Sequence, residues 1–407
     1  MQSLLIPNQN IALTASAAQR KILPYNPEYH GQKFRKLCVL GPNYRANRTP
    51  FWEGVKEISM HHVLINSQCL LSEIMTEIGN IEVQIRAAYA DNVVNGLTGS
   101  EVQKMMVMDG CFFLLLAFSI LGAGTDLKFP ENDPVFGTGC VNYDMHKWLK
   151  SMFFVGNQIP FMVLEKLMNL SFFKGLKTTL EFRQQLELGK RTLHKFLIVG
   201  QTPKPTDLIH CLQSIILGPI DVSNKAVGKK DDDIEDIVSA SKLSKCGIKF
   251  RKLEGELGIR AVKYECNTFG AVLYLPVLKV DRNTQLLVKC LLKYETVQEP
   301  RGFEPEASSF FKFMRELIRA SQDIEVLESE GIIQGQSHSL LGLLTTLDGM
   351  VSSSDMHYVK REIVGNRPWQ WQKPLKWMAF IFTTLTFLFG FMQMNYGILA
   401  YYKPGKS

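Results

Sequence analysis

The feature that most constrains this chain is a long uncharged stretch close to its C-terminus. No Asp, Glu, Lys or Arg occurs between Lys376 and Lys403. A helix rises about 1.5 Å per residue, so this stretch is long enough to cross the roughly 30 Å hydrocarbon core of a bilayer. A buried core helix is the alternative, but such helices rarely stay uncharged for so long. We therefore predict one transmembrane helix at residues 377–402, anchored by Trp377, Phe380, Phe382, Leu385, Phe389, Tyr396 and Tyr401.

Basic residues flank this stretch unequally. Five precede it and two follow it: Lys360, Arg361, Arg367, Lys373 and Lys376 before, and Lys403 and Lys406 after. Because basic flanks stay on the cytosolic side of a membrane, this asymmetry predicts a cytosolic N-terminal body. The N-terminus does not resemble a secretory signal, since no Lys or Arg precedes Arg20 and Pro7 interrupts the apolar run. We expect a single-pass protein of the plasma membrane.

The rest of the chain predicts a mainly α fold. Apolar residues recur at helical spacing through most of the first half and again after the middle of the chain. Between these regions, segments rich in β-branched and aromatic residues partly alternate, which predicts a small antiparallel β insertion at about 247–276. The predicted regions are an irregular N-terminal lead-in (1–45), a helical region (46–217), a charged linker (218–235), an α+β region (236–365), a basic and aromatic juxtamembrane segment (366–376), the transmembrane helix (377–402) and a short tail (403–407).

Composition excludes several classes of protein. The chain is 46% hydrophobic and 21% charged, which is ordinary for a globular protein and rules out a disordered chain. Its net charge of +7 is spread along the whole sequence. Proteins that bind nucleic acid more often concentrate basic residues on one element with interleaved aromatics, so we expect no nucleic-acid partner. No two of the eight cysteines form a C-x-x-C pair, and no zinc site is predicted.

Few residue patterns point to chemistry. The chain contains no phosphate-binding glycine loop, no dinucleotide fingerprint, no zinc-protease motif and no nucleophile elbow. His61 and His62 are adjacent, so their rings would diverge on a helix and make a poor pair of metal ligands. Asp109 stands just before an apolar run (111–123) that is too short to span a membrane and is interpreted as a core helix. The sequence predicts no catalytic, cofactor-binding or metal-binding residue.

Two polar positions in apolar surroundings are nevertheless unusual. We interpret Asp109 as a capping or buried hydrogen-bonded carboxylate, with a catalytic carboxylate as the alternative. Asn157 and Gln158 stand shortly before Pro160, which interrupts a helical stretch. We predict that the two side-chain amides satisfy backbone groups freed by the proline, which is a structural role.

These motifs resemble those of a plant family, the Domain of Unknown Function 247 family (uncharacterised protein family 0481). The first motif extends over residues 105–112 and the second over residues 157–165. The residues that match the family motifs are Asp109, Gly110, Cys111, Phe112, Asn157, Gln158, Pro160 and Glu165. The resemblance covers roughly residues 25–403, and Gly41-Pro42-Asn43-Tyr44 matches a degraded form of the family's N-terminal motif. One further departure is Gly156, which stands where the family usually has an acidic residue.

The resemblance implies a plant protein that ends in a membrane-spanning helix and has no established enzymatic activity. Some grass members are linked to self-incompatibility as pollen-side recognition factors. We therefore expect a membrane-anchored interaction, recognition or signalling protein, with the bilayer and an unidentified protein as partners and with no cofactor. The alternative is a membrane-bound enzyme of unknown chemistry. That alternative predicts a concave pocket on which Asp109, Asn157 and Gln158 converge.

Overall fold

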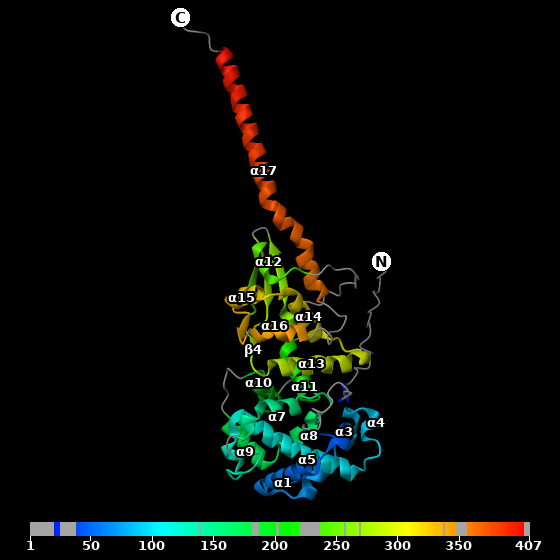
Figure 1. Cartoon of the computed structure of the whole chain (residues 1–407). Coiled ribbons are helices and arrows are strands. Elements are labelled where there is room, and N and C mark those ends of the chain that lie inside the picture. Colours follow the sequence, from blue (N-terminus) through cyan, green and yellow to red (C-terminus); the bar gives the residue numbers. More distant parts are fainter. Residues whose placement is uncertain are drawn as a thin grey trace, which may run out of the picture. The chain divides into compact units, whose positions relative to one another are not determined.

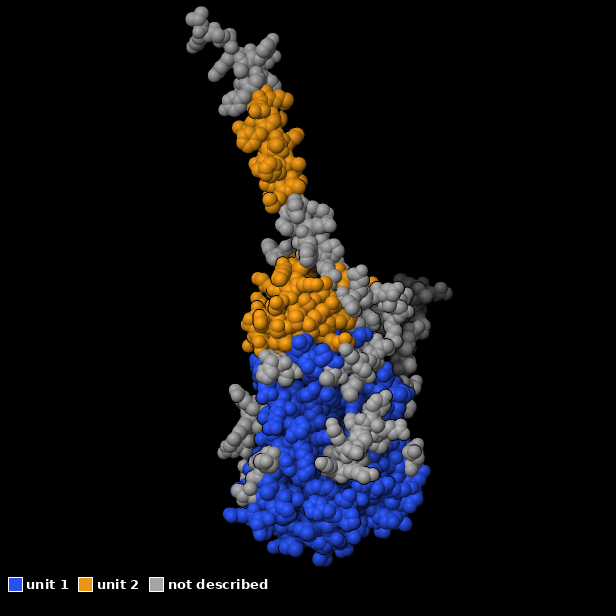
Figure 2. Space-filling model, in the orientation of Figure 1, with its two compact units in different colours: residues 1–219, 279–312, 334–355 blue, residues 220–278, 313–333, 356–407 orange. Residues whose placement is uncertain are grey.

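A computed structural model of the chain describes residues 20–24, 38–137, 140–180, 187–200, 203–219, 237–255, 258–267, 270–336, 338–346 and 356–402. The chain is mainly helical, as predicted, and it forms two compact units (Figures 1 and 2). Unit 1 comprises residues 1–219, 279–312 and 334–355, and unit 2 comprises residues 220–278, 313–333 and 356–407. Residues 220–236, which include nearly all of the predicted charged linker, and the predicted tail at 403–407 lie outside the described residues.

Unit 1 is a set of helices packed around α5 (Gly99–Phe118), which α1, α2 and α8 contact. Its other helices are α1 (Pro50–Ser67), α2 (Leu71–Gly79), α3 (Glu82–Ala88), α4 (Asp91–Val94), α6 (Cys140–Tyr143), α7 (Met145–Met152), α8 (Phe161–Leu167), α9 (Ser171–Thr179), α10 (Leu188–His194), α11 (Leu208–Leu217), α13 (Thr284–Gln298) and α16 (His338–Thr346). Short 3-10 or π turns extend or join some of them: η3 (Arg45–Asn47), η4 (Ser119–Ala123), η5 (Thr125–Leu127), η6 (Lys195–Val199) and η9 (Glu299–Arg301).

The central helix α5 begins where local side-chain chemistry predicts. Thr98 Oγ1 accepts a hydrogen bond from the backbone N–H of Glu101, and the Glu101 carboxylate accepts one from the N–H of Thr98, at 3.3 and 2.7 Å. This reciprocal arrangement satisfies two of the otherwise free N–H groups at a helix start. From Gly99–Ala123 the chain is long and apolar enough to span a membrane, but 83% of that apolar window is buried. The apolar run at 111–123 is therefore a core segment, as predicted.

Unit 2 contains a three-stranded sheet of β1 (Ile248–Lys252), β2 (Lys263–Asn267) and β3 (Gly270–Leu275), in the order β1-β3-β2. The prediction of an antiparallel sheet is correct for β2 and β3 and wrong for β1, which pairs with β3 in parallel. The difference lies in which strand β1 pairs with: after η8 (Ile259–Ala261), β2 and β3 form an antiparallel hairpin, and β1 lies beside β3 and not beside β2. Because β1 and β3 both run opposite to β2, they meet in parallel.

Two helices of unit 2 pack with this sheet and with each other. They are α12 (Ala240–Lys245), which contacts β1, and α15 (Ser321–Ser329), which contacts α12. The inward side chains of the strands, among them Phe250 and Leu273, are almost fully buried. The remaining elements are α14 (Glu306–Leu317) and a two-stranded sheet of β4 (Leu278–Val280) and β5 (Ile333–Gly335).

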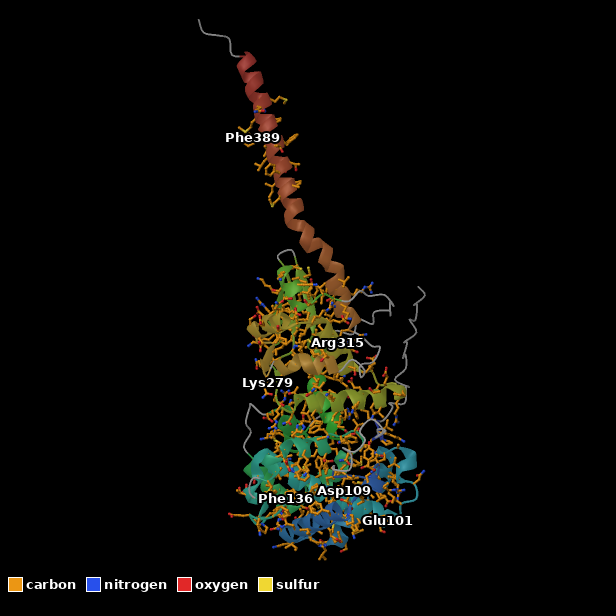
Figure 3. The ribbon with its side chains drawn as sticks, viewed as in Figure 1. Glu101, Asp109, Phe136, Lys279, Arg315 and Phe389 are labelled. Atoms are coloured by element: carbon orange, nitrogen blue, oxygen red, sulfur yellow. The ribbon has the colours of Figure 1, made fainter. Side chains whose placement is uncertain are left out.

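The longest element is α17 (His357–Tyr402), which includes the whole segment predicted as a transmembrane helix. Its first turns belong to the core of unit 2, because Val359 and Ile363 are completely buried and α17 contacts β2. Its apolar portion Met378–Asn395 is different, since none of it is buried. Phe389, for example, is 67% exposed (Figure 3). Two segments in the described chain are thus long and apolar enough to span a membrane, and burial separates the core helix from the exposed one.

Candidate functional site

Asp109 lies in the middle of α5 and is completely buried (Figure 3). Lys56 Nζ lies 2.9 Å from its Oδ1, and Arg48 Nη1 donates to the same oxygen at 3.3 Å. The other oxygen, Oδ2, accepts hydrogen bonds from Arg48 Nη2 and, at 2.8 Å, from the backbone N–H of Gly41. Asp109 is therefore a buried hydrogen-bonded carboxylate.

Glu53 completes a charge-balanced group, because its two oxygens lie 2.7 Å from Arg48 Nη1 and 2.8 Å from Lys56 Nζ. We call Arg48, Glu53, Lys56 and Asp109 the ion-pair cluster. Burial alone would raise the pKa of Asp109, but Lys56 and Arg48 outweigh burial and hold this pKa below its usual value. Burial alone would likewise lower the pKa of Lys56, and Asp109 raises it instead. Arg48, Lys56 and Asp109 are thus charged at neutral pH.

Sequence analysis missed three of the four members, Arg48, Glu53 and Lys56. The sequence does contain a pattern that indicates Lys56. Lys56 lies on the same side of α1 as Ser59, Met60 and Val63, and all of these are buried. A lysine at helical spacing within an apolar face predicts a buried cation, and a buried cation requires an acidic partner. The sequence does not reveal that the partner lies on a different helix.

The three residues that follow Asp109 have packing roles. A Cβ atom at Gly110 would lie 2.3 Å from Leu167 Cδ1, so a larger residue would force that side chain to shift where α5 packs on α8. Cys111 is completely buried, and burial raises the pKa of its thiol. Phe112 is also completely buried, and its ring makes edge or tilted contacts with three aromatic rings at 5.9 to 6.3 Å: Trp52, Phe136 and Trp148.

Asn157 and Gln158 bind backbone groups, but these groups lie at and just after the end of α7 and in residues 38–40 and are not ones that Pro160 frees. Asn157 Oδ1 accepts a hydrogen bond from the N–H of Leu40 at 2.7 Å, and its Nδ2 donates to the carbonyls of Cys38 and Ser151 at 2.9 Å. Gln158 Nε2 donates to the carbonyl oxygen of Met152, the last residue of α7, at 2.6 Å and to that of Phe154 at 3.1 Å. These amides therefore satisfy carbonyl groups at the end of α7, and Asn157 also holds residues 38–40 in place.

The last two motif residues lie at the start and on the surface of α8. Pro160 precedes the first residue of the helix, and the N–H of Phe161 donates to the carbonyl of Thr206 at 2.8 Å. Glu165 forms an ion pair with Lys204, and both side chains are substantially exposed. Glu165 therefore does not belong to the buried group around Asp109.

The two sequence motifs converge on residues 38–44, which the structure shows without regular helix or strand. Leu40 donates to Asn157 and the next residue, Gly41, donates to Asp109, so adjacent backbone N–H groups bind the two motifs. Gly41 has a φ of +65°, and a Cβ atom there would lie 2.7 Å from the Gln158 carbonyl oxygen. The segment therefore joins α5 to the stretch before α8, although it belongs to the predicted lead-in.

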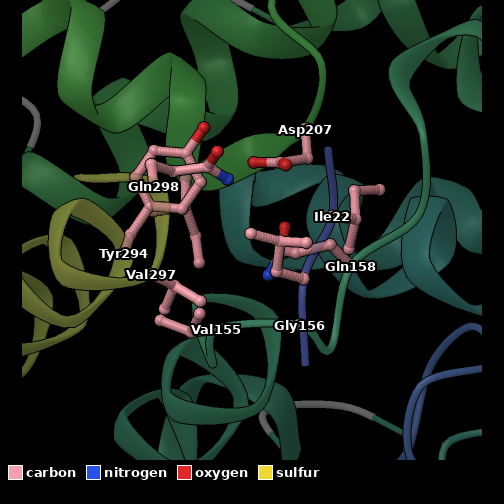
Figure 4. Close-up of a pocket in the computed structure, with 10 residues that line it drawn as sticks. Ile22, Val155, Gly156, Gln158, Asp207, Tyr294, Val297 and Gln298 are labelled. Carbon is pink, nitrogen blue, oxygen red and sulfur yellow. The ribbon is translucent and has the colours of Figure 1, made fainter. Parts of the chain in front are cut away.

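A small pocket of about 10 Å³, room for about one water molecule, adjoins this region within unit 1 (Figure 4). Gln158, Asp207 and Gln298 are among the residues that line it, but Asp109 and Asn157 are not. Asp207 caps α11 by accepting the N–H of His210 at 2.9 Å, and burial raises the pKa of Asp207 to about 6. The pocket predicted by the enzyme alternative, at which Asp109, Asn157 and Gln158 meet, is therefore not the cavity that the structure forms here.

His61 and His62 have different surroundings in the structure. His62 Nε2 lies 2.7 Å from the Leu127 carbonyl oxygen, and its ring stacks on Phe129 at 4.0 Å. His61 is exposed. Among the residues that the structure describes, no three His, Cys, Asp or Glu side chains are grouped so that they would hold a metal ion.

The fold and the ion-pair cluster define a mainly helical protein with a buried polar centre and an exposed apolar C-terminal helix. The chain belongs to the family described as plant protein of unknown function (DUF247), whose sequence model matches residues 35–387. A UPF0481 protein of Arabidopsis thaliana is 25% identical over 162 residues, which is 40% of this chain and 30% of that protein. The alignment therefore spans less than a third of this relative's length. No solved structure matches the chain.

Proposed function

We propose that this chain is a membrane-anchored interaction protein, with α17 crossing the bilayer between residues 377 and 402. The observation that carries the proposal is the exposure of the apolar part of α17. Phe380, Phe382 and Phe389 are each more than 60% exposed, and large apolar side chains occur on all sides of the helix. A helix that is apolar all round is normally buried in a protein or in a membrane. Within the described residues no part of this chain covers it.

Energetics support the same assignment. Residues 378–400 contain ten Phe, Ile and Leu residues. At about −0.3 to −0.6 kcal/mol each, these would favour insertion by roughly 3 to 6 kcal/mol. The polar residues Gln393 and Asn395 oppose insertion, but they lie towards one end of the span, where polar groups cost less. Asn395 Nδ2 also donates to the carbonyl of Phe391 at 3.0 Å, which reduces the cost of placing it in lipid.

The orientation that we propose leaves the body of the protein in the cytosol. The structure changes the charge count on which this orientation depends, because Lys360 is buried and forms an ion pair with Glu316. Lys360 therefore does not contribute to the flank. Four basic residues remain before the span, Arg361, Arg367, Lys373 and Lys376, against two after it, Lys403 and Lys406. The excess still favours a cytosolic body.

We propose an interaction role for the body in preference to catalysis. The strongest polar group of the motif region, Asp109, is bound by two cations and a backbone N–H, so it has no free charge to offer a substrate. The amides of Asn157 and Gln158 are occupied by backbone groups. A body whose motif carboxylate and amides are occupied within the fold, and which is tethered to a bilayer, is suited to binding another protein at the membrane surface.

The proposal is tested by fractionation of the tagged full-length chain in membrane vesicles with the cytosolic face outwards. The protein should remain in the pellet after carbonate washing, and added protease should digest the N-terminal body. A chain that ends at residue 376 should be released into the supernatant. Recovery of the full-length chain in the carbonate supernatant would contradict the proposed anchor. Protection of the body from protease would contradict the proposed orientation.

A further inference from the structure

The segment that forms the three-stranded sheet of unit 2 carries an excess of basic residues. Residues 237–278 contain seven Lys or Arg and three Asp or Glu. The sequence does not show whether these cations share a surface, because neighbouring residues of a strand point to opposite faces of a sheet. The strand register of the folded sheet decides it.

The exposed face of this sheet is positively charged. Along β1, Ile248 and Phe250 are buried, while Lys249 and Arg251 alternate with them and are exposed. Lys263 of β2 is also exposed, and it pairs across the sheet with the same residue of β3 that pairs with Arg251. The three cations therefore lie on one face of the sheet. We call Lys249, Arg251 and Lys263 the basic face.

Two of these three cations have no acidic partner in the part of the chain that the structure describes. Lys263 Nζ donates to Glu265 Oε1 at 2.7 Å and lies 4.8 Å from the centre of the Tyr274 ring. Neither Lys249 nor Arg251 forms an ion pair with a described residue. Unpaired exposed charges of one sign on one face produce a local potential that attracts an oppositely charged surface.

We propose that the basic face docks on the anionic lipid headgroups of the membrane that holds α17. The inference rests on the proposed function and adds a second, reversible contact with the bilayer. The sheet and α17 belong to the same compact unit (Figure 2), and α17 contacts β2. The anchor therefore keeps the basic face at a high effective concentration of lipid headgroups. The cytosolic leaflet is rich in anionic lipids, which attract basic surfaces close to a membrane span.

The part of α17 between the core of unit 2 and the proposed span sets how close the sheet can come to the bilayer. Ile363 is completely buried, and the exposed apolar part begins at Met378. This stretch measures about 22 Å as a helix, whereas attraction to a charged surface fades within roughly 8 Å at physiological salt. It also contains Pro368 and Pro374. Proline removes a helical hydrogen bond and allows a bend, so unit 2 can incline towards the lipid surface.

Energy transfer from the sheet to the bilayer tests the proposal in the full-length chain. A donor dye is attached to Cys266, the exposed thiol of β2, after Cys69→Ser, Cys140→Ser and Cys246→Ser remove the partly exposed thiols. The chain is reconstituted with a neutral acceptor lipid in vesicles of phosphatidylcholine alone or with about a third phosphatidylserine. Transfer should be greater with phosphatidylserine. It should fall to the phosphatidylcholine level in about 1 M salt, where screening shortens the reach of the charges to roughly 3 Å.

Charge variants locate the contact. Each basic side chain near an anionic lipid surface favours the docked form by about fivefold, so loss of two should disfavour it by roughly 30-fold. Lys249→Glu combined with Arg251→Glu should therefore abolish the increase in transfer that phosphatidylserine causes, whereas Lys249→Arg combined with Arg251→Lys should retain it. The matched control is Lys174→Glu with Lys177→Glu, two exposed positions of α9. It changes the net charge equally and should also retain the increase.

Two results would overturn the inference. The first is equal transfer in both kinds of vesicle, which is expected if an acidic protein segment, such as residues 231–236 of this chain, occupies the basic face instead of lipid. The second is an increase in transfer that survives Lys249→Glu with Arg251→Glu, because the attraction would then come from other residues. Failure of the anchor is a separate result, since the chain would be released from both kinds of vesicle by carbonate washing.

Discussion

The ion-pair cluster of unit 1 and the exposed apolar portion of α17 are opposite exceptions to the usual distribution of polar and apolar residues. In the cluster, charged side chains are buried, and every charge has an opposite charge from the same chain within hydrogen-bonding distance. In α17, apolar side chains are exposed, and no described residue of the chain covers them. The comparison shows that the first exception is resolved within the fold, while no described residue of the chain resolves the second.

The largest effect is expected from breaking the cluster. Asp109→Ala should lower the free energy of unfolding by about 3–5 kcal/mol, because it leaves Lys56 and Arg48 buried with too few acidic partners. The measurement is urea unfolding of the purified full-length chain in detergent, followed by tryptophan fluorescence. The control is Asp126→Ala, an exposed position where the change should stay within about 0.5 kcal/mol. A loss no greater than the control's would show that the cluster is not a stabilising centre.

The second effect concerns the exposed helix. Phe389→Arg places a charge near the middle of the proposed span and should disfavour insertion by about 2.5–3.5 kcal/mol. The carbonate-resistant fraction of the protein should fall, while urea unfolding of the body should be unchanged because Phe389 contacts no core. Phe389→Leu should behave like the parent chain. If the arginine variant stays fully membrane-bound, insertion of α17 is not what holds the protein in the membrane. The apolar surface of α17 would then have another role, such as contact with a partner protein.

A third measurement sharpens the contrast between a paired and an unpaired buried acid. Burial raises the pKa of Asp207 to about 6, from 3.8, because no cation binds it closely as Lys56 binds Asp109. The folded state therefore binds the proton more tightly than the unfolded state. Asp207 should therefore lower the free energy of unfolding by up to about 3 kcal/mol as the pH rises from about 4 to 6. Its contribution should stay constant at higher pH. Asp207→Asn should remove this component of the pH profile of urea unfolding. An unaltered profile would mean that Asp207 titrates normally.

The smallest effect is expected from the uncharged part of the motif region. Asn157→Ala leaves the N–H of Leu40 and the carbonyls of Cys38 and Ser151 without their side-chain partner. We expect a loss of about 2 kcal/mol, since an unsatisfied buried polar group costs roughly 1–3 kcal/mol. The loss should be smaller than for Asp109→Ala in the same urea assay. The opposite order would indicate that the amide, and not the ion pairs, is the main attachment of residues 38–44.

Local sequence determined much of this protein. The helical class, the cap at Thr98, the core segment after Asp109 and the uncharged helix at 377–402 all follow from patterns within a few turns of chain. That Asn157 and Gln158 bind backbone groups also follows locally, but for Asn157 two of the groups bound belong to a distant segment. The family resemblance of the two motifs was likewise readable from the residues.

Only the tertiary structure decided which distant groups meet. Gly41 and Asp109 are 68 residues apart, and the link between Leu40 and Asn157 spans 117. The parallel pairing of β1 and the burial of Lys360 against Glu316 are also long-range results. Hydrophobic periodicity states which face of an element is buried, but it does not state which element covers that face. For α17 the chain supplies no cover among its described residues, and in the proposed function the bilayer would supply it.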